Sequence, residues 1–503
     1  MPSISDLNEN SNDEDVEETI MLNPSEIEEE IISDGDVAMD SGSESDGGNG
    51  DSETIQEVQL QNDSIAYFDL HNDSIFCIAQ HPLNPSLIAT GGSEGDDDAG
   101  GMGYVFDASP EASVPSPVID QSTAGKDVTR NGIKPLFCLE GHTDSICSLA
   151  FTLPKGEALL SAGLDGKLRV YTEMQNHGWM FLGESQEVEE INWLTACPNE
   201  SYPNTIAIGA SDGSVWVYLV DSKSKDMPLQ IVQSYFLHTG SCTAGSWSND
   251  GKLLATVSED GSLYVWDVFG ESASAGVIQL GSAYVVGLSA LDQRFAVDGG
   301  LFSVAISPDG TFLAVGGAGG SIKVVSLPRL SSENSNSLIK GRNEKQLKGK
   351  SSTSNASAGQ AGKILADIKA QSDGIETLAF SPSPTILLAA GSVDGSVAIF
   401  DSAHEFAIRR LIKQAHEDHS VVKVEFVKNS TMGGFLLTSC GMDGVVRRWD
   451  TRGGSGTGLI REWKGHRGDG EGGGVLGFVQ GDDGSRIITA GDDGISLIFD
   501  SPL

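Results

Sequence analysis

The chain has 503 residues, of which 72 are acidic and 31 basic, giving a formal net charge of −41 at neutral pH. A field of this sign repels nucleic acid and anionic membranes and attracts basic partners, so direct contact with nucleic acid or a membrane surface is disfavoured. Hydrophobic residues make up 39% of the sequence, which is typical of a folded protein, and 62 glycines indicate many tight turns.

The cysteines argue against a metal or disulfide framework. They lie far apart, without a C-x-x-C pair, at Cys77, Cys138, Cys147, Cys197, Cys242 and Cys440. Such scattered thiols are typical of a reducing compartment. No basic-plus-apolar leader is present, and no apolar run approaches the roughly 18 residues of a membrane helix. We therefore expect a soluble intracellular protein, cytoplasmic or also nuclear.

The N-terminal segment differs from the rest of the chain. Residues 1–62 contain no Lys, Arg or aromatic residue, and residues 1–125 carry 29 acidic groups by count. A segment of this composition cannot bury enough apolar surface to offset the entropy of ordering. The sequence predicts a disordered acidic tail over 1–62, followed by a folded domain over 63–503.

Short apolar runs, rich in β-branched and aromatic residues, begin at SIAYFD (64–69) and predict strands. One turn-and-strand phrase then recurs, with Asp-Gly closing a hairpin between two strands. It reads GLDGKLRVY (163–171), ASDGSVWVY (210–218), SEDGSLYVW (258–266), SVDGSVAIF (392–400), GMDGVVRRW (441–449) and GDDGISLIF (491–499).

A second phrase precedes each hairpin, as in HNDSIFCIAQ (71–80), GHTDSICSLAF (141–151), HTGSCTAGSW (238–247) and AHEDHSVVKVEF (415–426). A unit with Gly319 in place of the turn Asp, and an earlier unit over 71–107 with an expanded turn, bring the total to eight units. Repeats of roughly 50 residues, each with about four short strands, predict a β-propeller. One blade cannot bury both of its faces alone, so the blades pack against one another in a ring. The fold class is all-β, an eight-bladed propeller.

Residues 64–503 resemble the WD-repeat family. In that family a His before the first strand, a Ser or Thr on the second, the turn Asp and an aromatic residue on the third form a buried hydrogen-bonded set. The resemblance implies three such sets here: His142, Ser161, Asp165 and Tyr171; His238, Thr256, Asp260 and Trp266; and His416, Ser439, Asp443 and Trp449.

The other blades depart from this pattern. The last has His466, Thr489 and Asp493, but Phe499 lacks a hydrogen-bond donor. In blades three, five and six the hydroxyl residue is replaced by Ile208, Val315 and Ala390, so we expect apolar packing there.

Ring closure and two loops can also be predicted. Only three residues follow Asp500, too few for a fourth strand, so the strand at 64–69 is expected to complete the last blade and remove its exposed edge. Segments 108–133 and 329–363 interrupt the repeat and are expected to be disordered loops. The second is basic, and contact with RNA, with the acidic tail or with solvent alone all stay open for it.

The sequence offers no convincing catalytic constellation. Almost every His, Ser/Thr and Asp that could suggest a triad belongs to the repeating pattern, and the acidic stretch EGDDDAGG (94–101) lacks the ligand spacing of a calcium loop. We expect a protein that is not an enzyme and that uses no cofactor or metal.

Surface charge is the remaining functional signal. In a WD-repeat ring, the loops before the first strands and the hairpins between second and third strands share one face, here called the top face. Its predicted carboxylates form an acidic binding surface for a basic polypeptide. They are Asp73, Asp96, Asp97, Asp98, Asp144, Glu187, Glu189, Glu190, Glu259, Asp373, Glu417, Asp418 and Asp492.

The acidic tail, eight blades, closing strand and long basic loop together resemble the angio-associated migratory cell protein family. Its fungal branch is the dedicated chaperone of large-subunit ribosomal protein ten. The resemblance implies a monomer that captures the basic N-terminus of this nascent protein and escorts it to cytoplasmic pre-ribosomes. Two alternatives stay open: a histone chaperone, and a WD-repeat scaffold or ubiquitin-ligase adaptor.

Overall fold

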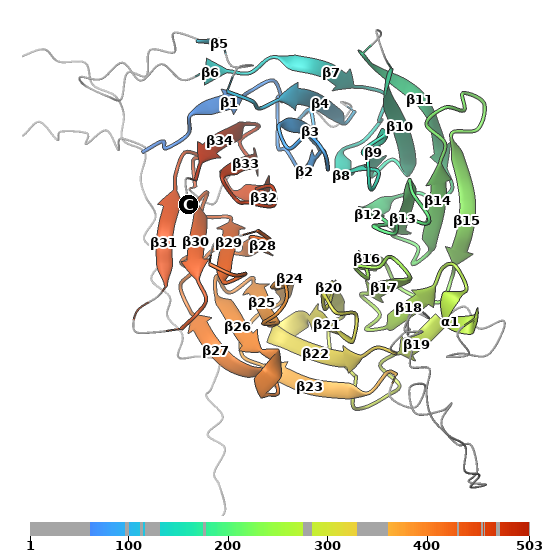
Figure 1. Ribbon diagram of the computed structural model, residues 1–503, viewed down its shortest axis with the longest axis vertical. Helices are drawn as coiled ribbons and strands as arrows, with labels where there is room; N and C mark the ends of the chain where they lie inside the picture. The colour runs from blue at the N-terminus through green and yellow to red at the C-terminus, as the bar shows by residue number, and fades with distance from the viewer. Residues whose placement is uncertain are drawn as a thin grey trace, which may run out of the picture. The chain divides into compact units, whose positions relative to one another are not determined.

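The computed structural model describes residues 61–95, 100–110, 114–115, 131–174, 178–274, 284–328, 361–429, 432–453, 456, 458–468 and 473–501. Residues 58–503 form one compact unit, in which eight antiparallel sheets surround a common axis (Figure 1). The predicted eight-bladed propeller is therefore confirmed. The predicted acidic tail lies outside the described residues. Among those described, no helix is long and apolar enough to cross a membrane.

Each blade has four strands, ordered from the axis outward. Blades one to four consist of β2 (Cys77–Gln80), β3 (Leu87–Gly92), β4 (Met102–Asp107) and β7 (Pro135–Leu139); β8 (Ile146–Phe151), β9 (Ala158–Gly163), β10 (Lys167–Met174) and β11 (Gly178–Gln186); β12 (Ile191–Ala196), β13 (Thr205–Ala210), β14 (Val215–Val220) and β15 (Leu229–Tyr235); β16 (Cys242–Trp247), β17 (Leu253–Ser258), β18 (Leu263–Asp267) and β19 (Tyr284–Leu288).

Blades five to eight follow in the same order around the ring. They consist of β20 (Leu301–Ile306), β21 (Phe312–Gly317), β22 (Ser321–Ser326) and β23 (Ile364–Lys369); β24 (Ile375–Phe380), β25 (Leu387–Ser392), β26 (Val397–Asp401) and β27 (Ala407–Ile412); β28 (Val421–Phe426), β29 (Leu436–Gly441), β30 (Val446–Asp450) and β31 (Leu459–Trp463); β32 (Val475–Val479), β33 (Arg486–Gly491) and β34 (Ser496–Asp500), completed by β1 (Ala66–Phe68). A single-turn helix, α1 (Glu271–Ser274), follows β18.

The N-terminal strand closes the ring, as the sequence predicts. β1 pairs antiparallel with β34, with Ala66 opposite Ile498 and Phe68 opposite Ser496. Phe68 is fully buried, and its ring stacks on that of Phe106 in the first blade. The strand thus covers the outer edge of the last blade and joins it to the first.

Of the loop expected at 108–133, residues 111–113 and 116–130 lie outside the described residues, and part of the remainder forms strands. Two small strands, β5 (Val114–Pro115) and β6 (Asn131–Gly132), pair with one another, and β6 pairs in parallel with β1. Ile133 is buried. The outer edge of β1 is therefore partly covered. Of the loop expected at 329–363, residues 329–360 lie outside the described residues.

Neighbouring blades are joined by one recurring polar contact. At five successive junctions, a side chain on the innermost strand of one blade donates a hydrogen bond to a backbone carbonyl of the next blade. The acceptor is the first residue of that blade's innermost strand. The pairs are Cys77 Sγ to Ile146 O (3.4 Å), Cys147 Sγ to Ile191 O (2.8 Å), Asn192 Nδ2 to Cys242 O (2.9 Å), Thr243 Oγ1 to Leu301 O (2.6 Å) and Ser303 Oγ to Ile375 O (2.7 Å). All six cysteines are free thiols, and burial raises the pKa of Cys147 to about 12. The Cys77 and Cys147 thiols act as structural donors.

A pair of truncated chains tests the closing strand. We expect a chain that begins at residue 70 to lose at least about 3 kcal/mol in free energy of unfolding, because the buried Phe68 side chain and the pairing with β34 are both removed. Urea denaturation and size-exclusion chromatography would measure the loss and any association through the freed edge. A chain that begins at residue 61 keeps β1 and is the matched control. Equal stability of the two chains would contradict a closing role.

Candidate functional site

Hydrogen bonds between the strands and the turns hold the loops of the top face in place. In blade seven, His416 Nδ1 lies 2.8 Å from Asp443 Oδ1, and its Nε2 lies 2.7 Å from Ser439 Oγ. Trp449 Nε1 donates to the same Ser439 oxygen at 2.8 Å. His416 is fully buried and the other three are nearly so. The four residues implied by the family pattern thus meet in one chain of hydrogen bonds.

Blade two keeps the first part of this chain. His142 bridges Ser161 Oγ (2.7 Å) and Asp165 Oδ1 (3.0 Å). The Tyr171 hydroxyl instead donates to the Glu140 carbonyl at 3.4 Å and accepts from Arg169.

In blade four a further residue, Ser262, joins the set; it belongs to the recurring turn phrase, but the sequence analysis gave it no role. His238 contacts Thr256 and Ser262, and the Ser262 hydroxyl in turn donates to Asp260. Trp266 Nε1 donates to Thr256 at 2.8 Å. The serine stands two positions after the turn Asp, where blade two has Lys167. Blades three and six also have a serine at this position, Ser214 and Ser396, and each donates to its own turn Asp.

Blade eight keeps the histidine set, with His466 between Thr489 Oγ1 (2.8 Å) and Asp493 Oδ1 (3.0 Å), whereas blade six uses another group. In blade eight, where Phe499 has no donor, the Thr489 hydroxyl lies 3.2 Å from the Leu497 carbonyl. In blade six, Gln371 takes the place of the His and donates to Ser396 at 2.9 Å. Ile208, Val315 and Ala390 are buried among apolar neighbours, as expected.

Burial fixes the charge state of these sets. Burial lowers the pKa of His238 to about 4, with Asp260 opposing the shift, and burial also lowers the pKa of His71 to about 4. For Asp443, burial alone would raise the pKa, but the hydrogen bond from His416 and the charge of Arg447 lower it to about 2. In blades four and seven, a neutral histidine near an ionised aspartate therefore persists across the physiological range.

Contacts between loops and hairpins show that the predicted carboxylates share the top face. Ser74, before β2, donates to Asp492 Oδ1 at 2.6 Å, and Asp492 lies in the β33–β34 hairpin. The Ser241 amide, before β16, donates to Glu259 of the β17–β18 hairpin. Similarly, the Ser211 amide donates to the Glu190 carbonyl. Loops and hairpins thus meet on one side, within a blade in the last two cases and between blades eight and one in the first.

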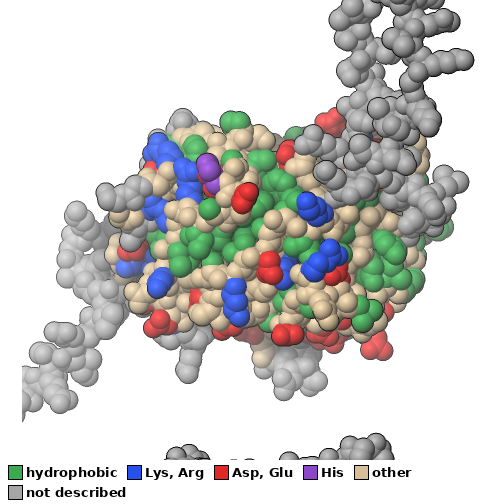
Figure 2. All heavy atoms as spheres, turned by 90° about the horizontal axis from the view of Figure 1, so that it is seen from below, with side chains coloured by type: hydrophobic (Ala, Val, Ile, Leu, Met, Phe, Trp, Pro, Cys, Tyr) green, Lys and Arg blue, Asp and Glu red, His purple; other side chains and the backbone are tan. Residues whose placement is uncertain are grey.

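Eight of the predicted carboxylates are exposed there: Asp144, Glu187, Glu189, Glu190, Glu259, Asp373, Glu417 and Asp418. Asp73 and Asp492 are half-buried, while Asp96, Asp97 and Asp98 lie outside the described residues. The same loops also carry exposed Lys413 and Arg467, and Arg294, whose guanidinium is paired with Asp292 at 2.6 Å. In a side view, acidic side chains line one rim of the ring (lower edge of Figure 2), with Lys and Arg on the flank above.

Three further carboxylates were missed by the sequence analysis. Asp212 in the β13–β14 hairpin and Asp298 before β20 are exposed in top-face loops, and the repeat alignment would have found them. Glu376 is an exposed residue of the innermost strand β24, a place where loop positions give no signal. Partial burial and then the charge of Asp373 raise the pKa of Glu376. A cation bound beside Glu376 would stabilise its charged form, because the cation would offset both the partial burial and the repulsion from Asp373.

The top face also has a cleft between blades two and three. It is lined by Gln186, Glu187, Val188 and Glu189 on one side and by Ser211 and Asp212 on the other, with a volume of about 700 Å³. Among the described residues, no cluster of three His, Cys, Asp or Glu is placed to hold a metal ion.

Comparison with known proteins agrees with this architecture. The WD domain, G-beta repeat family model matches residues 133–172, 229–267, 294–326, 362–401 and 409–450. The crystal structure of Sqt1 from Chaetomium thermophilum is 55% identical, covers 88% of this chain and 98% of its own, and superposes with a TM-score of 0.75. The chain belongs to the Sqt1 family. A second Chaetomium Sqt1 structure, also 55% identical with a TM-score of 0.75, holds the N-terminus of the ribosomal protein L10.

More distant relatives place the Sqt1 family within the predicted resemblance. The ribosome assembly protein SQT1 of Saccharomyces cerevisiae is 28% identical over 90% of each chain. The human angio-associated migratory cell protein is 24% identical over 88% of this chain and 82% of its own. The family resemblance drawn from the sequence is therefore confirmed.

The buried histidines predict a pH-dependent stability. A histidine with a folded pKa near 4 and an unfolded pKa near 6.5 contributes stability that is present above pH 6.5 and lost as the pH falls toward 4, up to about 3 kcal/mol. We expect His238→Gln to lose less stability than wild type between pH 7 and pH 4, because glutamine already fills this role in blade six. Urea unfolding of both chains at several pH values measures how the free energy of unfolding changes with pH.

The control for this experiment is His404→Gln, since the His404 side chain is 75% exposed. It should keep the wild-type pH dependence. A His238→Gln chain with an unchanged slope would contradict the assignment.

Proposed function

We propose that this protein is a ribosome-assembly chaperone that captures the basic N-terminus of a large-subunit ribosomal protein, of the L10 type, on its acidic top face. The single observation that carries the proposal is the exposed set of carboxylates that interlocked loops hold on one face. The Chaetomium Sqt1 bound to the L10 N-terminus, at 55% identity, supports the choice of client. The yeast relative's name supports the role in ribosome assembly.

Electrostatics supply the mechanism. A newly made ribosomal protein carries dense positive charge, which invites aggregation and premature contact with RNA. An acidic face neutralises that charge, and the stronger polyanion of the pre-ribosome later competes for it. Each exposed ion pair adds only about 0.2–1 kcal/mol, so the field mainly speeds capture and excludes acidic competitors.

The same proposal covers the other expected properties of the protein. It acts as a monomer, without catalysis or a cofactor, in the cytoplasm where its client is translated. The chain itself does not need to touch RNA, because its charge opposes such contact.

Charge reversal on the top face tests the proposal. We expect Glu189→Lys/Glu190→Lys to weaken binding of an L10 N-terminal peptide about tenfold, and Asp418→Lys to weaken it less, because attraction is replaced by repulsion. Isothermal titration calorimetry measures both. Glu200→Lys, an exposed reversal in the β12–β13 hairpin of the opposite face, is the control and should bind like wild type.

Salt provides a second, independent check. The affinity should fall steeply as ionic strength rises from low to high, because screening shortens the reach of exposed charges. Binding that is insensitive both to salt and to these reversals would contradict the proposal. A preference for core histone tails over the L10 peptide would instead favour the histone-chaperone alternative.

A further inference from the structure

One position of the repeat changes its chemistry in blade three. Four residues after the turn Asp or its equivalent, on the third strand, blades two, five and seven carry a cation that is neutralised within the chain. Arg169 pairs with Glu184, Lys323 with Asp367 at 2.7 Å, and Arg447 with Glu462 at 3.6 Å. In blade three this position is Trp216, and in blades four, six and eight it is Tyr264, Ala398 and Leu497. Blade three therefore has an aromatic ring at this position and no basic side chain.

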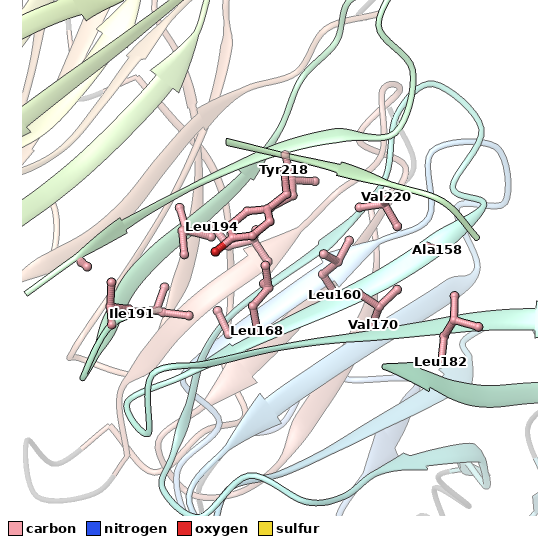
Figure 3. Packing of buried hydrophobic residues seen from close by; sticks show 14 residues of the cluster. Ala158, Leu160, Leu168, Val170, Leu182, Ile191, Leu194, Tyr218 and Val220 are labelled. Atoms are coloured by element: carbon pink, nitrogen blue, oxygen red, sulfur yellow. The ribbon is translucent and has the colours of Figure 1, made fainter. Parts of the chain in front are cut away.

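Trp216 forms an aromatic ledge with Phe236. The two rings meet edge to face, with centroids 5.6 Å apart and an interplanar angle of 88°. Trp216 is half-buried and packs against the apolar cluster between blades two and three, part of which is shown in Figure 3. Phe236 stands beyond the end of β15 and is 63% exposed. An aromatic side chain so exposed and yet held by a fixed neighbour is a ready contact surface.

The ledge adjoins the acidic cleft. Trp216 Nε1 donates to Ser214 Oγ at 2.9 Å, and Ser214 Oγ donates to Asp212, which lines the cleft. Val188 lines the cleft too and belongs to the cluster on which Trp216 rests. Trp216 therefore links the exposed Phe236 ring to the carboxylates of the cleft.

The carboxylates of this site have no cation of their own. Within the described part of the chain, Glu187, Glu189 and Asp212 form no ion pair with a Lys or Arg, in contrast to Glu184 and Glu462 in the neighbouring positions of other blades. The site therefore has an excess of negative charge next to an aromatic face. Its complement is a cation with a flat, polarisable surface.

We propose that this ledge and cleft bind one arginine side chain of the basic client and so determine specificity for arginine over lysine. The inference rests on the proposed function and adds an anchor to it. A guanidinium can stack on an aromatic face while its edge pairs with carboxylates, whereas an ammonium is a compact and strongly hydrated charge. The chain itself shows the arrangement one blade away, where the Arg169 guanidinium lies 4.2 Å from the Phe181 ring centroid and pairs with Glu184.

A double-mutant cycle tests the anchor with the full chain and a synthetic L10 N-terminal peptide. We expect Phe236→Ala to weaken binding about fivefold, and to do so at high salt as well as low, because stacking is less screened than an exposed ion pair. Peptides in which each arginine is replaced in turn by lysine should include one that weakens wild type but adds little in Phe236→Ala. Trp216→Phe, which keeps a ring in the cluster, should weaken binding less than Phe236→Ala.

The control is Met227→Ala, since Met227 is 64% exposed in the same blade but follows β14 on the opposite side. If Phe236→Ala binds like wild type while Glu189→Lys/Glu190→Lys does not, the anchor is overturned and the proposed function stands. If every lysine peptide loses affinity equally for wild type and Phe236→Ala, the ledge does not hold arginine. If wild type fails to bind the L10 peptide, the function and the anchor fail together.

Discussion

The ring depends on how each innermost strand is joined to the next. All five carbonyls that accept a side chain from the preceding blade belong to residues where the strand register shifts, namely Ile146, Ile191, Cys242, Leu301 and Ile375. A bulge disrupts the local ladder, and a buried carbonyl left without a donor would cost free energy. The donor from the neighbouring blade removes that cost. At these five junctions, the same β-bulge thus bends the innermost strand and supplies the carbonyl that bonds to the neighbouring blade.

These joints also help to position the loops of the top face. The bulged residue comes directly after the loop that holds the acidic side chains, so the position of each loop is fixed at its base by the joint. The buried histidine sets fix the hairpins from the other side, as His416 does through Asp443. The turn aspartates that contact a buried histidine, Asp165, Asp443 and Asp493, serve this scaffolding. The carboxylates that remain exposed, such as Glu189 and Asp418, are free to meet a partner.

Much of this could be predicted from the sequence because it repeats. The turn phrase recurs often enough, even with Gly319 in place of one Asp, to predict eight blades and the closing strand. What does not recur was missed. The joints use Cys, Asn, Thr and Ser in turn, so they leave no common motif. The pairing of β6 with β1 joins segments that have no periodic relation.

In the candidate site too, contacts that do not follow the repeat could not be predicted from the sequence. Trp216 looks in the sequence like any aromatic residue of a third strand, and Phe236 like a loop residue, and only the fold brings their rings together beside Asp212. Exposed carboxylates attract a charged partner over a distance, so their effect does not depend on exact positions. Composition and loop position are therefore enough to predict an acidic face. An aromatic contact acts only at close range and depends on exact neighbours. A face that attracts any basic chain can therefore be read from charge alone, whereas discrimination among basic chains must come from such close contacts, which are visible only in the folded protein.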